Sequence, residues 1–264
     1  MDILKRDLAP LTQEAWNEID DRATEVLKTH LTARKVLRVE GPKGWDYTVI
    51  PEGRLSILDK EKGKVKSGQY EVKPLVETRI SFTLDRWEMD NLTRGARDIK
   101  LDAMEEAMHK IAVFEEEAVY NGYSKGGIKG LVESAEHDSM TFGESGEEIL
   151  ESLSMAVIRM KDAYQNGPFT LIVGEEGWKR VNKGMQGYPL IKRIEKLIGG
   201  EVVFSSVLKG ALLLPQDHED LEMLIGGDFS IGYESHDAQT VTLFAAESFT
   251  FRVLDPSIVI PFTV

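Results

Sequence analysis

The chain contains few residues whose types and spacing could do chemistry. Glu106 and His109 have the E-x-x-H spacing that places a carboxylate and an imidazole on one face of a helix, as in ferritin-like di-iron proteins. Those sites need two such motifs and two further glutamates, whereas this sequence has one motif and many predicted strands. We therefore expect a solvated helix face at this position and no metal site.

Other catalytic and phosphate-binding arrangements fail on spacing. The segment 124–130, SKGGIKG, matches neither glycine-rich phosphate-binding pattern, so a hinge or turn is the favoured interpretation. The five histidines lack metal-ligand spacing, and no serine lies in a G-x-S-x-G elbow. Cysteine is absent, which excludes disulfides and thiolate nucleophiles. The sequence predicts no catalytic residues and no enzyme.

The segment 224–237, LIGGDFSIGYESHD, is ambiguous on its own. Its Gly-Gly pair could form a turn between strands or approach a ligand closely. His236 beside Asp237 could be an oriented imidazole, but an exposed turn explains the pair equally well.

Composition sets broad limits. The chain has 264 residues, of which 42% are hydrophobic and 29% charged, as in an ordered globular protein. The net charge of −13 argues against sequence-independent binding of nucleic acid, which needs clustered Lys and Arg. No segment has the apolar length of a signal peptide or membrane span, so we expect a cytoplasmic protein without a membrane partner.

Two long helices and one capping box stand out in the first half of the chain. The apolar stripe over residues 11–37, with Thr12 as N-cap, predicts one continuous helix, and residues 101–121 predict a second. Ser145 and Glu148 form a capping box that should open a third helix.

Residues 45–82 change to strand composition around the polar turn 59–64, which predicts a long hairpin. An isolated hairpin is only marginally stable. Its apolar residues must therefore pack either on their own domain or on a neighbouring subunit, and the pattern alone does not decide between these.

The second half mixes both element types. A buried strand is predicted over residues 169–173, short helices around Trp178 and over 190–197, and mostly strands from residue 201 onward. The whole chain is thus predicted to be α+β, with a middle portion inserted between two mixed segments.

Several segments in order resemble the encapsulins, shell proteins of bacterial and archaeal nanocompartments that share the fold of tailed-bacteriophage major capsid proteins. These segments are LKRDLAPLTQEAWNEID, GPKGWDY, FTLDRWEMDNLTRG, GGIKGL, GYPL, and the pair GGDFSIGYESHD and ESFTFRVLDP near the end. The resemblance spans essentially the whole chain. It implies a peripheral domain (1–45, 77–131 and 221–264), an extended loop (46–76) that reaches over the adjacent subunit, and an axial domain (132–220).

The resemblance also implies function. The chain would self-assemble into an icosahedral homo-oligomer of about 60 copies or a small multiple. It would enclose a cargo enzyme, a dye-decolourising peroxidase or a ferritin-like protein, by binding the cargo's C-terminal targeting peptide, and so serve iron storage or oxidative-stress defence. The alternative is a bacteriophage or prophage major capsid protein that packages DNA.

Three sets of site residues follow from the resemblance. The cargo-peptide groove would involve Leu27, Arg34, Leu37, Val39, Asp228, Phe229, Ser230 and Ile231. A fivefold pore would be lined by Lys183, Gly184, Met185, Gln186, Gly187 and Tyr188, which include no acid or histidine to select metal cations. No cofactor is required, although flavin could stack between Trp87 and Tyr188.

Overall fold

The structure, a computed structural model, describes residues 3–59, 61, 63, 65–183 and 187–264. The helices are α1 Gln13–His30, α2 Ala33–Val36, α3 Arg86–Thr93, α4 Asp102–Tyr120, α5 Leu131–Ser134, α6 Gly146–Asp162, α7 Glu175–Val181 and α8 Leu190–Ile198. The strands are β1 Arg38–Glu40, β2 Val49–Ile57, β3 Gly68–Pro74, β4 Val76–Asp85, β5 Met140–Thr141, β6 Phe169–Val173, β7 Val202–Phe204, β8 Ala211–Pro215, β9 Leu221–Ile225, β10 Ser230–His236, β11 Thr240–Val253 and β12 Ile260–Thr263.

The helix predicted over residues 11–37 is present, but it is interrupted at Leu31 and Thr32. Thr12 caps α1 as expected, its side chain accepting a hydrogen bond from the Ala15 N–H at 3.2 Å. The helix ends at His30, and a short second helix, α2, carries Arg34. The helix is interrupted at Thr32 because a buried carboxylate of α4, Glu116, accepts hydrogen bonds from the backbone N–H groups of Thr32 and Ala33, as described below.

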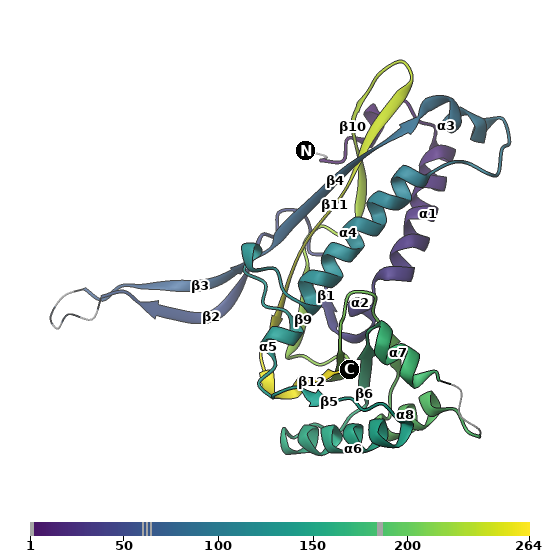
Figure 1. The fold of residues 1–264 in the computed structure, drawn as a ribbon. Coiled ribbons are helices and arrows are strands. Elements are labelled where there is room, and N and C mark those ends of the chain that lie inside the picture. The colour runs from purple at the N-terminus through teal and green to yellow at the C-terminus, as the bar shows by residue number, and fades with distance from the viewer. Residues whose placement is uncertain (1–2, 60, 62, 64, 184–186) are drawn as a thin grey trace.

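The long helix α4 packs beside α1 and against a five-stranded sheet (Figure 1). In that sheet β11 is the central strand: its first part lies between β4 and β10, and its last residues pair with β9, which in turn pairs with β1. The buried apolar side chains of α1, α4, β4, β10 and β11 form one hydrophobic core. These elements hold the end of α1 next to the start of β10.

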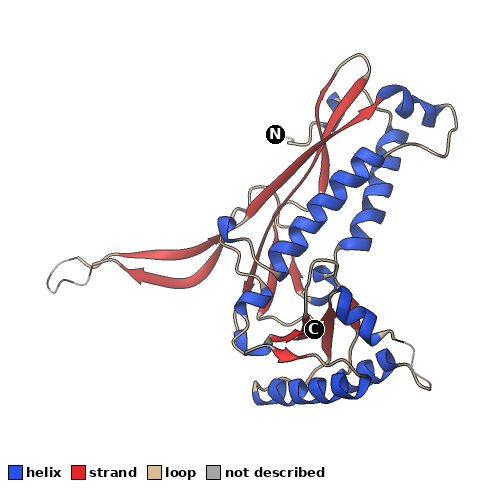
Figure 2. Cartoon of the chain, in the orientation of Figure 1, coloured by secondary structure: helices blue, strands red, loops and turns tan. Residues whose placement is uncertain are grey.

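A second five-stranded sheet has the order β5-β12-β8-β6-β7 and lies near α6, α7 and α8 (Figure 2). The predicted strand over residues 169–173 and the capping box of Ser145 and Glu148 at the start of α6 are both confirmed. The last strand, β12, pairs with β8 and β5 in this sheet. It therefore packs with residues 132–220, whereas the sequence placed it in the peripheral domain.

The hairpin predicted between residues 45 and 82 is present as β2 and β3, which pair only with each other and project away from the body (Figure 1). Large apolar side chains on it remain exposed, including Leu55 at 48%, Tyr70 at 79% and Val72 at 50%. The hairpin does not fold flat on its own chain. Only a partner outside this chain could therefore cover these apolar side chains.

Candidate functional site

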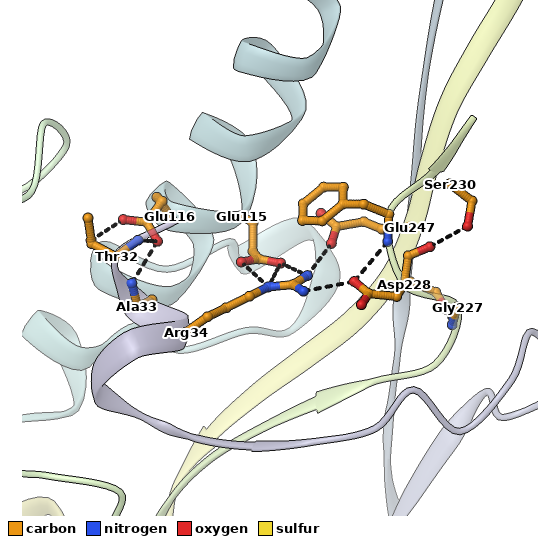
Figure 3. A network of polar contacts seen from close by, with 11 residues as sticks. Thr32, Ala33, Arg34, Glu115, Glu116, Gly227, Asp228, Ser230 and Glu247 are labelled. Carbon is orange, nitrogen blue, oxygen red and sulfur yellow. Dashed lines mark hydrogen bonds and ion pairs between the residues drawn. The ribbon is translucent and has the colours of Figure 1, made fainter. Parts of the chain in front are cut away.

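A buried glutamate shapes the junction between α1 and α2. The backbone N–H groups of Thr32 and Ala33 both donate to Oε1 of Glu116 at 2.8 Å, and the Thr32 hydroxyl contacts Oε2 (Figure 3). The Tyr120 hydroxyl lies 2.9 Å from the Thr32 Oγ1. Glu116 thus accepts hydrogen bonds from N–H groups that the start of a helix leaves without partners. It therefore fixes the start of α2, the helix that carries Arg34.

Arg34 is the centre of a second network (Figure 3). Its guanidinium donates to Glu115 on α4 from Nε at 2.9 and 3.0 Å and from Nη2 at 2.5 Å. It also donates to Asp228 at 2.7 Å and to Glu247 on β11 at 3.1 Å. The guanidinium carbon lies 4.6 Å from the ring centroid of Phe229, close enough for a cation–π contact. One side chain therefore joins α2, α4, β11 and the turn before β10.

The electrostatics of this network are unusual because three carboxyl groups share one guanidinium. The Glu115 and Glu247 side chains are fully buried, while Asp228 is 45% exposed. Burial, followed by repulsion from Glu115, raises the pKa of Glu247 well above its ordinary value, against the opposing charge of Arg34. Burial alone would lower the pKa of Arg34, but its hydrogen bonds and ion pairs with Glu115 and Asp228 raise it, so the guanidinium stays charged.

The Gly-Gly pair of the ambiguous segment forms the turn that presents Asp228. A Cβ on Gly227 would lie 2.3 Å from the Trp45 ring, so only glycine fits there. The Gly227 N–H donates to the Ser248 hydroxyl at 2.8 Å, and the Ser230 hydroxyl donates to the Asp228 carbonyl at 2.8 Å. The segment is thus a packed turn leading into β10. His236, at the far end of β10, lies 2.7 Å from the Tyr233 hydroxyl through its Nδ1.

A hollow of about 260 Å³ lies between α1, α4 and the start of β10. We call it the α1–β10 groove; it is lined by Leu4, Arg6, Asp20, Ala23, Thr24, Leu27, Met108, Phe229, Ser230 and Ile231. Its walls are mixed: Leu27, Phe229 and Ile231 supply apolar surface, whereas Arg6 and Asp20 supply an ion pair at 2.8 Å. Phe229, beneath Arg34, connects the groove with the buried network.

The structure brings together part of the residue set implied by the resemblance. Leu27, Phe229, Ser230 and Ile231 line the α1–β10 groove. Through their contacts with each other and Phe229, Arg34 and Asp228 lie next to it. Ile231 is only 4% exposed and is also a core residue.

Leu37 and Val39 are not among the residues lining this groove. Leu37 is 4% exposed and packs in the core around the second sheet, and Val39 lies on β1 beside β9. The displacement follows from the break at Thr32, because the chain leaves the helical path before it reaches them.

Sequence reasoning missed Leu4, Arg6, Asp20, Ala23, Thr24 and Met108 in the groove, and Glu115 and Glu247 in the network. Asp20, Thr24 and Leu27 have the i, i+4, i+7 spacing of one helix face, so the pattern around Leu27 could have identified them. Glu115 lies at helical spacing from Ile111 and Val119, so the apolar pattern of this helix could have marked it as buried, although not as a partner of Arg34.

The predicted pore and flavin residues are placed differently. Met185, Gln186 and Gly184 lie outside the described residues, while Lys183, Gly187 and Tyr188 flank them between α7 and α8. Trp87, on α3, and Tyr188, before α8, lie at opposite ends of the molecule (Figure 1). The predicted stacking pair is therefore wrong within one chain, because a planar flavin cannot reach both rings.

The E-x-x-H motif lies on a solvated helix face, as expected. Glu106 pairs with Lys110 at 2.6 Å, and the His109 ring packs 4.4 Å from the ring of His30, centroid to centroid. Among the residues that the structure describes, no group of three or more His, Cys, Asp or Glu side chains is placed to hold a metal ion. Within the same residues, no helix has both the length and the apolar character needed to cross a membrane.

A long helix on a five-stranded sheet, a second inserted sheet and a projecting hairpin define the fold of capsid-forming shell proteins. The structure of a virus-like particle from Pyrococcus furiosus matches with a TM-score of 0.68 at 17% identity, covering 92% of this chain and 97% of that one. The structure titled Microbacterium phage Oxtober96 matches with a TM-score of 0.59 at 13% identity, covering 89% and 91%. These low identities establish a shared fold.

Sequence comparison is more specific. Residues 1–250 match the family Linocin_M18, described as "Encapsulating protein for peroxidase". The type 1 encapsulin shell protein of Rhodospirillum rubrum is 35% identical over 269 residues, covering 99% of this chain and 96% of its own. The one from Mycolicibacterium paratuberculosis is 33% identical over 264 residues and covers both chains fully. The chain therefore belongs to the type 1 encapsulin shell protein family, and it is a structural shell protein and not an enzyme.

Replacing Glu116 by Gln should remove a pH dependence from the stability of the protein. Burial raises the pKa of Glu116 from 4.5 to about 7, against the opposing hydrogen bonds from Thr32 and Ala33. A carboxyl with a raised pKa contributes its full stability below its unfolded value, and loses that contribution as the pH rises through its folded value. The native chain should thus lose about 2–3 kcal/mol of unfolding free energy between pH 4.5 and 8 through this group.

The amide side chain introduced by E116Q would keep the acceptor for Thr32 and Ala33 without the charge, so this variant should show a smaller loss over that range. Thermal or denaturant unfolding at pH 5 and pH 8, at equal protein concentration, measures the difference. Glu106→Gln, at an exposed position on the same helix, is the matched control. Identical pH dependences for E116Q and the native chain would contradict the assignment.

Proposed function

We propose that copies of this chain assemble into a closed icosahedral shell and enclose a cargo enzyme by binding its C-terminal peptide in the α1–β10 groove. The observation that carries the proposal is this groove: the apolar side chains of Leu27 and Phe229 lie among polar lining residues, next to the guanidinium of Arg34 and the partly exposed carboxylate of Asp228. An extended peptide could place alternate apolar side chains against Leu27 and Phe229. Asp228 and the Arg6–Asp20 pair at the rim offer polar contacts that would fix its register.

The division of labour along the chain follows the family's architecture. We infer that residues 46–76 act as the extended loop, residues 132–220 together with β12 as the axial domain, and the remainder as the peripheral domain. The loop flanked by Lys183 and Tyr188 would line a narrow pore at the fivefold axis. Because these pore residues include no acid or histidine, we expect passage of small molecules without selection for metal cations.

The enclosed enzyme sets the physiological role. The family description names a peroxidase, which supports a dye-decolourising peroxidase as the first cargo to test and peroxide handling as the role. A ferritin-like cargo would instead give a compartment for iron storage. Both cargoes would use the same groove, because the groove contacts a terminal peptide and not the folded enzyme.

Electron microscopy of particles purified from native cells, followed by mass spectrometry of their contents, tests the proposal. Closed particles filled with a host peroxidase or ferritin-like protein are the expected result. Packaged DNA would favour the alternative of a phage-type capsid protein, and the absence of particles at physiological salt would overturn the assembly.

Replacing Leu55, Tyr70 and Val72 together by serine should weaken the shell far more than the folded subunit. Each side chain is about half exposed or more in the single chain, so its loss should change the unfolding free energy of the subunit little. If a neighbouring subunit covers them, each loss costs about 1–2 kcal/mol of contact per subunit. Light scattering measures the particle fraction, and circular dichroism checks the subunit.

Gln69→Ser, on the same arm of the hairpin, serves as the control because it removes an exposed polar side chain. Shells of the triple variant that withstand denaturant as well as native shells would count against the role of residues 46–76 as an extended loop.

A further inference from the structure

Helix α6 carries two surface grooves that the cargo site does not use. Its buried stripe consists of Ile149, Leu153, Ala156 and Met160, which face the core around the second sheet. Met155 and Ile158, on the other face, remain 52% and 59% exposed, and both lie close in sequence to the lining residues of a groove. The outer side of α6 is therefore a surface that offers apolar side chains to a partner outside the chain.

The first groove, the α6–α8 groove, has a volume of about 460 Å³ and is lined by Leu150, Ser154, Tyr188, Arg193, Lys196 and Leu197. Its charged lining residues are both basic. Tyr188, at its rim, is 65% exposed. Arg193 and Lys196 form no ion pair with the described residues, so their charges are available to an external carboxylate.

The second groove, the α6–β5 groove, has a volume of about 390 Å³ and lies on the other flank of α6. Met140, Glu148, Glu151, Met155 and Arg159 are among its lining residues. Glu148 is engaged in the capping box, whereas Glu151 is exposed and forms no ion pair with the described part of the chain. This flank thus presents the carboxylate of Glu151 beside the exposed Met155, with the guanidinium of Arg159 four residues further along the helix.

The two grooves lie on different flanks of one helix, so one copy could present one groove while the next copy presents the other. Successive helix residues are rotated by about 100°, so Ser154 in one groove and Met155 in the other point to different flanks of α6. A head-to-tail contact around a symmetry axis joins two different surfaces of the same chain. One surface here is basic with an aromatic rim, and the other carries a free carboxylate and a thioether, which packs well on aromatic rings.

We propose that the two grooves are the complementary sides of one repeated contact between copies of this chain. Met155 and Glu151 of one copy lie in the α6–α8 groove of the next, where the thioether packs on Tyr188 and the carboxylate pairs with Lys196. This inference rests on the proposed self-assembly and adds which surfaces meet; it does not depend on the cargo groove.

Charge reversal tests the contact. Glu151→Lys and Lys196→Glu should each lower the fraction of protein in particles by about tenfold or more, because each places like charges together. The combined E151K/K196E variant should return to within about twofold of the native fraction, since the pair is restored with opposite polarity. Glu219→Lys, at an exposed turn outside both grooves, controls for the change in net charge.

Cysteine cross-linking gives a second measurement, which remains possible even if the charge variants fail to assemble for another reason. The native chain has no cysteine, so Met155→Cys with Tyr188→Cys introduces the only thiols. Mild oxidation of intact particles should give a ladder of covalent oligomers on a non-reducing gel, whereas each single variant should stay monomeric.

Native-like assembly of both single reversals, or failure of the combined variant to recover, would overturn the contact. The absence of covalent oligomers from oxidised particles of the double-cysteine variant would also overturn the contact. If the native chain forms particles while these tests fail, only the contact falls. If the native chain forms no particles, the proposed assembly fails first and this inference with it.

Discussion

Replacing Arg34 by methionine should lower the free energy of unfolding by about 3–5 kcal/mol, because it leaves buried carboxyl groups without their cation. Glu115 and Glu247 are fully buried, and Arg34 donates to both as well as to Asp228. Methionine keeps much of the side-chain length but cannot donate a hydrogen bond. Midpoints of thermal or denaturant unfolding, compared at equal protein concentration, measure the loss.

The matched control removes the carboxylates together with the cation. Arg34→Met combined with Glu115→Gln and Glu247→Gln should recover most of the stability, because no charge then remains buried at this point. Arg34→Lys should lie between the two, since an ammonium group cannot make the forked contacts with Glu115 that Nε and Nη2 make together. If R34M alone were as stable as the native chain, the network would not hold α2 to α4 and β11.

Replacing Phe229 by aspartate should reduce cargo loading by about a hundredfold while particles still form. The ring lies at the groove beside Leu27 and is partly exposed, so a charge there would meet the apolar side chain of an incoming peptide and would remain unpaired once covered. The loss of the contact between Phe229 and Arg34 adds to the effect. The measurement is the amount of reporter protein, fused to the C-terminal residues of the co-purified cargo, that is enclosed per shell.

Leu27→Asp should behave in the same way from the opposite wall of the groove. Ile231→Asp should instead impair folding, because Ile231 is 4% exposed within the core, and loss of soluble protein would distinguish the two effects. Val39→Asp distinguishes the groove residues implied by the family resemblance from those that line the groove in the structure. The family resemblance predicts lost loading, whereas the position of Val39 on β1, among residues that do not line the groove, predicts retained loading. Full loading of both F229D and L27D would exclude the α1–β10 groove as the docking site.

Local signals in the sequence were sufficient for several elements. Thr12 and the pair Ser145 and Glu148 cap helices where predicted, because capping depends on side chains within three residues of one another. The buried strand at residues 169–173 was predictable from its unbroken apolar run. The hairpin was predictable from its turn and strand residues, although whether it packed on its own chain was not.

What failed depended on residues distant in the sequence. The pattern predicted one helix through Thr32 because Leu31, Ala33 and Leu37 continue the apolar spacing; the break arises from Glu116, 84 residues away. The same break moves Leu37 and Val39 out of the predicted groove. Glu115 and Glu247 could not be recognised as partners of Arg34, since they lie 81 and 213 residues away from it in the chain.

By itself, then, the sequence determined the capped helices, the strands, the α+β class, the absence of a catalytic set and the family to which the chain belongs. These follow from short-range patterns and from segments matched in order. Only the tertiary structure decided that Asp228 is the partner of Arg34 and that Phe229 lies between that ion pair and the groove. The physical reason is burial: the free energy of a carboxylate depends on the charges and donors that the fold brings to it, and at this site they come from four elements far apart in the chain.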